Sequence, residues 1–205
     1  MIDSKIEAII FDFGGVLINL DYERTIKAFK SLGIENFHQL YSQATQENLF
    51  DDIETGAIQS AEFISGIMKY LPNDASTEQV IEAWNAMILD VPHSTIDLLQ
   101  SIQDKYRIFL LSNTNEIHLP YALEKWYETT DTRFEKYFEK TYLSYEMGMR
   151  KPNKEIFEFV CNENSLDPRR TLFIDDSAQH LEGAKQVNLQ THHLDSIQML
   201  SKVFS

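Results

Sequence analysis

The feature that most constrains the fold of this chain is a short apolar run, residues 8–11, that ends at Asp12 and is followed by Gly14 and Gly15. A run of this length without polar alternation predicts a strand buried on both faces, as in a parallel sheet covered by helices. The two glycines allow a sharp turn and a close approach of the backbone to a ligand. Taken alone, Asp12 is equally compatible with capping the strand end and with chemistry there.

Further apolar runs occur at 106–111 and 171–174, with weaker strand candidates at 140–143 and 190–194. Helical spacing of apolar residues separates them, for example Ile96, Leu99 and Ile102. Strands that alternate with helices in this way predict right-handed βαβ units. We therefore expect the α/β class, with a doubly wound parallel sheet that forms a Rossmann-like core.

The segment between the first strand and residue 92 has a different character, because its apolar residues recur at helical spacing and it offers no strand. We predict an inserted all-helical cap domain at 19–91, joined to a catalytic core of residues 1–18 and 92–205. One or two short helices are expected within 37–52. Selectivity for a substrate is expected among cap residues such as Arg24, Trp84 and the turn Glu54-Thr55-Gly56.

Composition restricts the possible partners. The net charge is −14, from 32 acidic and 18 basic residues, which argues against nucleic acid and anionic membranes. A small anionic substrate is still compatible with this negative net charge, because a few cations or a metal can make the electrostatic potential positive at a single site. The single cysteine, Cys161, cannot form an internal disulfide and is expected in the core. Without a signal peptide or a membrane-spanning run, we expect a cytoplasmic protein, and the sequence gives no oligomeric state.

The predicted strand ends bring several reactive groups together. Because the carboxyl ends of parallel strands share one edge, Asp12, Ser112-Asn113 and Asp175-Asp176 should meet there. Lys151 should reach the same edge, since Pro152 is expected in the first turn of the next helix. Each group alone has an ordinary role as a cap or a solvated side chain. As an ordered set they favour phosphoryl transfer.

That chemistry gives each residue a role. Asp12 would be a carboxylate nucleophile, and Asp175 and Asp176 would hold Mg²⁺. Lys151 would neutralise charge, and Ser112 and Asn113 would donate hydrogen bonds to phosphate oxygens.

Four stretches carry a family resemblance: residues 11–17, 111–115, 148–152 and 173–177. They resemble the four successive motifs of the haloacid dehalogenase-like hydrolase superfamily, and within it the bacterial sugar-phosphate phosphatases of the α-D-glucose-1-phosphate phosphatase type. The resemblance covers almost the whole chain, including the position of the cap. It implies a Mg²⁺-dependent phosphatase of small phosphorylated metabolites, with sugar phosphates favoured, that forms an aspartyl-phosphate. The implied metal ligands are Asp12, the Gly14 carbonyl and Asp176, with Asp175 as a ligand or its partner.

Gly14 departs from the common pattern of that superfamily. Most of its phosphatases carry an aspartate there, which protonates the leaving oxygen and then activates water. The glucose-1-phosphate phosphatase type also resembles this chain in having glycine, so the departure is compatible with activity. Asn19 and Asp21 are the nearest substitutes, although an N-cap role is favoured for Asp21.

Two alternatives stay open. A metal-independent 2-haloacid dehalogenase would also lack the second aspartate, although Asp175-Asp176 argues for a metal. A catalytically silent phosphate-ester-binding or regulatory protein has no chemical need to retain Asp12 and Lys151. Among the histidines, we expect His118 on the surface and His192 and His193 away from the motifs, in structural or solvent-facing roles.

Overall fold

The computed structural model of the chain describes residues 3–34, 37, 48–72 and 75–204. Its centre is a five-stranded parallel sheet in the order β3-β2-β1-β4-β5. The strands are β1 (Ala8–Phe11), β2 (Arg107–Ser112), β3 (Lys140–Leu143), β4 (Thr171–Asp175) and β5 (Gln190–His193). Phe11 pairs with Leu110 on one side and Ile174 on the other, so the ends of the three inner strands are aligned. The predicted α/β class and the parallel sheet are confirmed.

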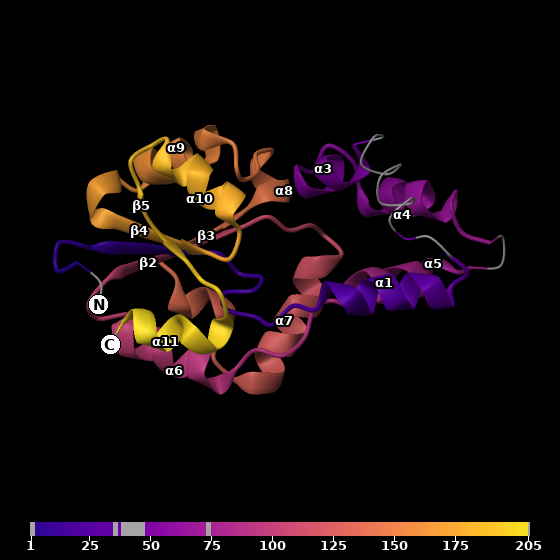
Figure 1. The fold of residues 1–205 in the computed structure, drawn as a ribbon, viewed down its shortest axis with the longest axis horizontal. Coiled ribbons are helices and arrows are strands. Elements are labelled where there is room, and N and C mark those ends of the chain that lie inside the picture. The colour runs from indigo at the N-terminus through magenta and orange to yellow at the C-terminus, as the bar shows by residue number, and fades with distance from the viewer. Residues whose placement is uncertain (1–2, 35–36, 38–47, 73–74, 205) are drawn as a thin grey trace.

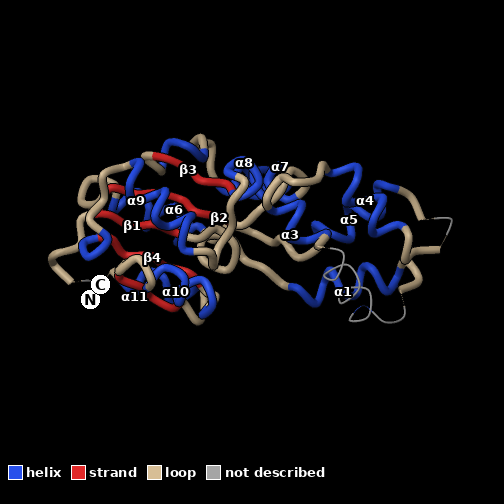
Figure 2. The backbone as a smooth tube through the Cα atoms, turned by 90° about the horizontal axis from the view of Figure 1, so that it is seen from above, coloured by secondary structure: helices blue, strands red, loops and turns tan. Residues whose placement is uncertain are grey.

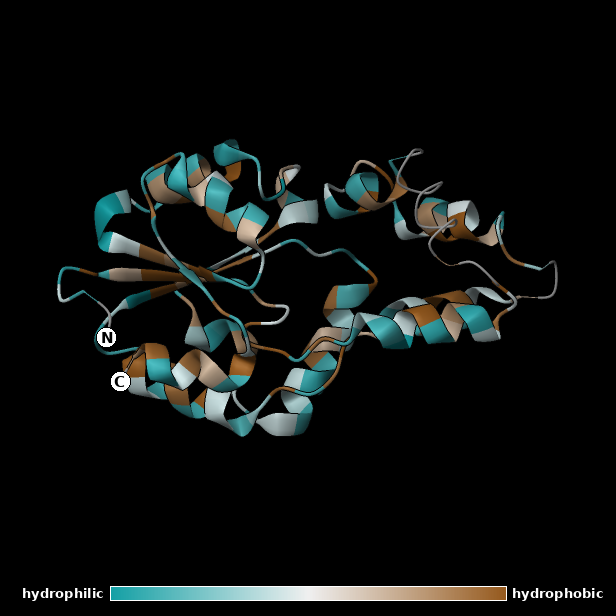
Figure 3. Ribbon diagram, in the orientation of Figure 1, coloured by the Kyte–Doolittle hydropathy of each residue, from teal (hydrophilic) through white to brown (hydrophobic). Residues whose placement is uncertain are grey.

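Helices cover both faces of the sheet, as Figures 1 and 2 show. One face carries α9 (Lys154–Glu163) and α10 (Ala178–Lys185), and the other α6 (His93–Ile102), α7 (His118–Thr129) and α11 (Leu200–Val203). Ile9 and Phe11 pack into one apolar cluster, and Ala8 and Ile10 pack into the other. Figure 3 shows the apolar strands between helices whose outer surfaces are polar. Burial on both faces explains why the first apolar run has no polar alternation.

The region predicted as a cap forms four described helices: α1 (Tyr22–Ser31), α3 (Leu49–Glu54), α4 (Ser60–Met68) and α5 (Thr77–Asn85). They lie beyond the carboxyl edge of the sheet (Figure 1), and no strand occurs among the described residues of 19–91. Most of the stretch 37–52 lies outside the described residues, and its end forms α3. The boundaries at 18/19 and 91/92 stay predictions.

Two chain segments connect these helices to the sheet, and they run side by side. Leu20 and Ile88 form an antiparallel bridge. Asn19 N donates to Asp90 O at 3.0 Å, and Leu89 N donates to Asn19 O at 2.9 Å. The two connections are thus hydrogen-bonded to each other and form a two-stranded ribbon.

The start of α9 differs from our prediction. Pro152 does not lie in its first turn: the Lys151-Pro152 peptide bond is cis and part of a turn, and the helix begins at Lys154 after Asn153. The backbone N–H and C=O of Lys151 both bond the Asn113 side chain, which keeps this segment out of the helix.

Short elements complete the chain: α8 (Ser144–Met147) and the 3-10 turns η1 (Phe134–Tyr137), η2 (Pro168–Arg170) and η3 (Ile197–Met199). Cys161 is buried in α9, as expected. Among the described residues, no helix has the length and apolar character needed to cross a membrane.

Candidate active site

A buried lysine between two carboxylates forms the centre of the site. Lys151 Nζ lies 2.8 Å from Asp12 Oδ1 and 2.8 Å from Asp175 Oδ2. The Lys151 and Asp175 side chains are fully buried, and 10% of the Asp12 side chain is exposed. Asp12 follows the central strand and Asp175 ends its neighbour, so the sheet register brings them together. The predicted convergence of these three residues is observed.

The charges within this cluster are unequal in number, because one ammonium serves two carboxylates. Burial raises the pKa of Asp12 to about 7, against the lowering effect of Lys151. Burial also acts on Asp175, but Lys151 and His180 outweigh it and lower the pKa of Asp175 to about 2. Burial lowers the pKa of Lys151, and the two carboxylates more than offset it and raise that pKa. Lys151 is therefore charged, and Asp12 is the residue of the cluster whose protonation state changes near neutral pH.

Several contacts hold Lys151 in place. The Asn113 amide donates to Lys151 O at 2.9 Å, and its oxygen accepts from Lys151 N at 3.0 Å. On the other side, α10 packs so closely that a Cβ on Gly183 would lie 2.0 Å from Pro152 O. The Asn113 amide thus positions the Lys151 loop. Its predicted contact with phosphate stays a prediction, as does that of Ser112, which is buried at the end of β2.

The loop after β1 lies against Asp176. Gly15 has φ +70, and a Cβ there would lie 2.2 Å from Asp176 Oδ2. Only a glycine allows both this backbone conformation and this close approach. Burial and the charge of Asp175 raise the pKa of Asp176. Carboxylate and backbone carbonyl oxygens are the donors that Mg²⁺ prefers, and the assignment of Asp12, the Gly14 carbonyl and Asp176 as its ligands stays a prediction.

Two histidines support this edge of the sheet, and no sequence pattern predicted either role. His180 Nδ1 lies 3.0 Å from both oxygens of Asp175. His193 Nε2 lies 3.0 Å from the carbonyl oxygen of Asp176, so our expectation that His193 lies away from the motifs is wrong. The register explains this contact, because β5 pairs with β4 and places His193 opposite Asp175. Asp12, Asp175 and His180 could also hold a metal as a group, but Lys151 already lies between the two carboxylates.

A cavity of about 540 Å³ lies between the sheet edge and the cap helices. Gly14, Ser112 and Asn113 line its floor, and its walls are mainly apolar. His118 lines this cavity and is half-buried, so the expectation that it lies on the surface is wrong. Its ring stacks on Trp84 at 5.0 Å between ring centroids, and its Nδ1 lies 2.8 Å from Asn85 Oδ1. Burial lowers the pKa of His118 to about 3, so the ring is neutral near pH 7.

An ion-pair cluster joins the sheet side of this cavity to the cap side. Arg150 precedes Lys151, and its guanidinium pairs with Asp51 and Glu54 of α3. Arg150 Nη2 lies 2.9 Å from Glu54 Oε2. Burial raises the pKa of Glu54 to about 7, against the lowering effect of the Lys151 charge. The turn at Glu54 was expected to contribute to selectivity, and its contact with Arg150 was not predicted.

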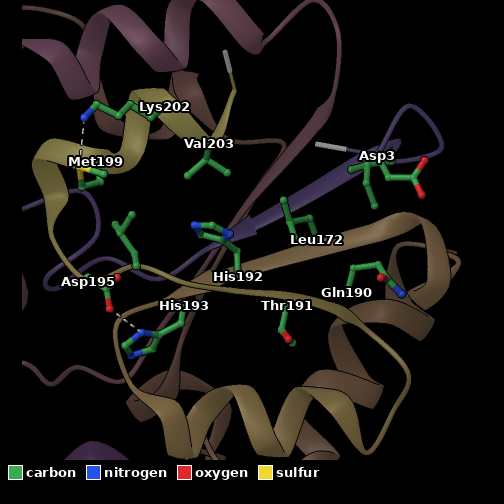
Figure 4. Close-up of a pocket in the computed structure, with 12 residues that line it drawn as sticks. Asp3, Leu172, Gln190, Thr191, His192, His193, Asp195, Met199, Lys202 and Val203 are labelled. Carbon is green, nitrogen blue, oxygen red and sulfur yellow. Dashed lines mark hydrogen bonds and ion pairs between the residues drawn. The ribbon is translucent and has the colours of Figure 1, made fainter. Parts of the chain in front are cut away.

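A second cavity, of about 410 Å³, lies along β5 and the C-terminal segment (Figure 4). Asp3, His192 and Lys202 are among its lining residues, and His193 points toward Asp195 at its edge. None of the predicted site residues lines it.

The fold and the central cluster define a class of enzyme. It has a parallel α/β sheet with an aspartate at the end of the central strand, held by a buried lysine beneath a helical cap. Residues 6–188 match the family described as haloacid dehalogenase-like hydrolase. The chain belongs to that family, and it is a hydrolase.

Known proteins of similar sequence and structure include phosphatases. A HAD family enzyme from Bacteroides thetaiotaomicron, solved with magnesium and inorganic phosphate, is 39% identical with a TM-score of 0.89, and the match covers 98% of this chain and 100% of that one. A predicted HAD-like family hydrolase from Porphyromonas gingivalis is 30% identical with a TM-score of 0.85, over 98% of each chain. D-ribitol-5-phosphate phosphatase from B. thetaiotaomicron is 28% identical over 91% of this chain and 90% of that protein. The narrower likeness to the glucose-1-phosphate phosphatase type stays a prediction.

Proposed function

We propose that this protein is a Mg²⁺-dependent phosphatase that hydrolyses small phosphorylated metabolites, with sugar or sugar-alcohol phosphates as the substrate class. The observation that carries the proposal is the position of Lys151 Nζ, 2.8 Å from both Asp12 and Asp175, at the carboxyl ends of β1 and β4. A buried cation that orients a carboxylate next to Phe13 and Gly14, which line the cavity, suits attack on an anionic ester.

The residues have distinct roles in this proposal. Asp12 attacks phosphorus and forms an aspartyl-phosphate, and water then hydrolyses that intermediate. Phe13 N donates to Asp12 Oδ1 at 2.7 Å, which leaves Oδ2 as the attacking atom. Lys151 stabilises negative charge on the transferring group, and the Ser112 hydroxyl donates to its oxygens. Asn113 holds the Lys151 loop and is the second proposed phosphate contact.

The metal would be held by Asp12, the Gly14 carbonyl and Asp176, with Asp175 oriented beside them by Lys151 and His180. When bound, Mg²⁺ would supply positive charge that offsets repulsion between the substrate dianion and the carboxylates. The excess of carboxylates over cations at this edge supports the assignment, as does the magnesium and phosphate complex of the similar B. thetaiotaomicron enzyme.

The substrate class rests on the cavity and on one relative. A cavity of about 540 Å³ suits a small ester better than a phosphoprotein loop. The similarity to D-ribitol-5-phosphate phosphatase favours a short polyhydroxylated leaving group.

The test is phosphate release from a panel of monoesters with Mg²⁺, including ribitol 5-phosphate and glucose 1-phosphate. We expect Asp12→Asn to lower turnover by roughly 10³-fold or more, because the nucleophile is lost. The matched control is Asp104→Asn, an exposed aspartate before β2 and remote from the predicted carboxyl edge. Wild-type protein that releases no phosphate above the Asp12→Asn background would contradict the proposal. Halide release from 2-haloacids that persists in chelator would establish the dehalogenase alternative instead.

A further inference from the structure

A phosphatase of the kind proposed above, on which this inference rests, has no proton donor at Gly14. Gly14 has no side chain, and a Cβ there would lie 2.7 Å from Leu20 Cδ1. Leu20 thus already fills the space into which a side chain at residue 14 would project. Hydrolysis of an alkyl ester still needs an acid for the leaving oxygen and a base for water. These functions must come from another group.

The two nearby candidates from the sequence are engaged elsewhere. Asp21 caps α1, where its side chain accepts from Glu23 N at 3.1 Å. Asn19 donates from its side chain to Asp90 Oδ1 at 3.3 Å, within the ribbon that connects the cap helices to the sheet. Both side chains serve local structure. Asp21 therefore has the N-cap role favoured above.

Among the described residues that line the active-site cavity, five have titratable or charged side chains: Tyr22, Asp51, Glu54, His118 and Arg150. Tyrosine and arginine keep one protonation state near neutral pH. Burial keeps His118 neutral, with its Nδ1 engaged by Asn85. The Asp51 side chain is 63% exposed and pairs with Arg150, so it is directed to solvent and to the guanidinium. Among the described residues that line the cavity, Glu54 is left as the group whose proton can be exchanged near neutral pH.

The environment of Glu54 suits such a role. Its side chain is 25% exposed, and Oε2 is buried without a hydrogen bond among the described residues, although Arg150 Nη2 lies 2.9 Å away. The charged and titratable groups around it are Arg150 and Lys151 of the loop, Asp51 of the same helix and Tyr22 of α1. A buried carboxylate oxygen without a hydrogen bond is costly, and the cost falls when the carboxyl gains a proton or meets a substrate hydroxyl.

We propose that Glu54 is the general acid and base of this enzyme, supplied by the cap in place of the missing side chain at Gly14. In the first step, Asp12 bonds to phosphorus, the bond from phosphorus to the ester oxygen breaks, and Glu54 gives that oxygen its proton. In the second step, water bonds to phosphorus, its proton passes to Glu54, and the bond between phosphorus and Asp12 breaks. The sum is ester plus water to alcohol plus phosphate, with Glu54 reprotonated.

Arg150 is the positioning residue in this arrangement. It is adjacent to Lys151 in the chain, and it binds Glu54 and Asp51 on the cap side. The contact therefore places the proton carrier over the floor of the cavity whenever the cap helices are docked. It also keeps the Glu54 carboxyl near Lys151, the cation that we propose stabilises the transferring phosphoryl group.

The experiment compares two esters in Glu54→Gln and wild type. With an alkyl ester such as ribitol 5-phosphate, whose leaving oxygen needs a proton, we expect kcat to fall by roughly 10²–10⁴-fold. With p-nitrophenyl phosphate, whose leaving group needs no proton, the first release of nitrophenol should remain fast. Steady-state turnover of that ester should slow, because the second step has lost its base, and a burst of nitrophenol should appear. The decline of wild-type kcat/KM for the alkyl ester above pH of about 7 should disappear in Glu54→Gln.

Asp51→Asn is the matched control, because Asp51 shares the Arg150 contact with Glu54. If the role of Glu54 were purely structural, Glu54→Gln and Asp51→Asn would each lose equal activity on ribitol 5-phosphate and on p-nitrophenyl phosphate. That result would overturn the proposal. A rise in KM with unchanged kcat would also overturn it, since Glu54 would then be a binding group. If Glu54→Gln is fully active while Asp12→Asn is inactive, the proposal fails and the phosphatase function stands. Inactivity of wild type on every ester would instead overturn the proposed function itself.

Discussion

Replacing Lys151 by methionine tests the electrostatics of the central cluster. Methionine keeps the unbranched stem that passes the Phe173 ring, where Lys151 Nζ lies 5.4 Å from the ring centroid, but it removes the charge. Asp12 and Asp175 would then face each other with side chains 10% and 0% exposed. Removing one partner of a buried ion pair costs about 3–5 kcal/mol, because an uncompensated charge stays buried. For a chain of this length, that loss lowers Tm by about 6–20 °C.

The pH dependence of that loss has a definite direction. Asp175 keeps its bonds from Ser177 N at 2.7 Å and from His180 at 3.0 Å, so Asp12 is the carboxylate that takes up a proton. A carboxyl whose pKa is raised on folding stabilises the protein below its unfolded pKa, and the benefit is lost as pH rises through the folded pKa. We therefore expect the deficit of Lys151→Met to shrink as pH falls from 8 toward about 5.

The assay is urea unfolding of wild type, Lys151→Met and Lys154→Met across that pH range. Lys154 is a matched control because its pair with Glu158 is exposed, with side chains 48% and 47% accessible, so its loss should cost under about 0.5 kcal/mol. Adding Asp175→Asn to Lys151→Met should recover part of the stability, since it removes one orphaned charge. Equal unfolding midpoints for the two lysine variants, or no recovery in the double variant, would refute the reasoning.

Two further outcomes follow from contacts around the same cluster. Gly183→Ala should destabilise the protein by about 1–3 kcal/mol and lower kcat, because the new Cβ would lie 2.0 Å from Pro152 O and displace the Lys151 loop. Gly148→Ala, with φ +66 and nothing within 4 Å of its Cβ, is the control and should cost only the backbone strain of about 1 kcal/mol. Asp175, whose pKa is about 2, should contribute about 2 kcal/mol above pH 4 that is lost as pH falls through 2. Urea unfolding against pH should show this slope in wild type and lack it in Asp175→Asn.

Local sequence patterns were sufficient to predict the central cluster of the site. Asp12 and Asp175 follow apolar runs, and the parallel sheet then determines that they meet. Lys151 could be assigned because it lies in a short loop before a helix that returns to the same sheet. The alternation of strands and helices was enough for this step, since the register of parallel strands aligns their ends.

The parts that depend on packing between distant segments could not be predicted. The contact of Glu54 with Arg150 requires the docking of α3 against the loop after α8, and neither segment carries a pattern that reports the other. His118 was expected on the surface, but Trp84 of the cap stacks on its ring, a contact between segments that are far apart in the sequence. The contact of His193 with Asp176 depends on β5, whose short and polar sequence gives a weak strand signal. The sequence pattern of one helix or strand does not indicate which side chains of a distant segment will contact it.

The paired ribbon at Leu20 and Ile88 has a consequence for how such a chain can diversify. The two segments that connect the sheet to the cap helices are hydrogen-bonded to each other. The whole cap region is therefore attached to the core at a single place. An exchange of that whole segment for another helical one would leave all five strands and their order untouched. The proposed nucleophile Asp12 and its partner Lys151 belong to the retained part, whereas the group that we propose moves the proton belongs to the exchangeable part. New substrate ranges and new proton carriers could thus be acquired together, in one genetic event, by a scaffold that keeps Asp12 and Lys151.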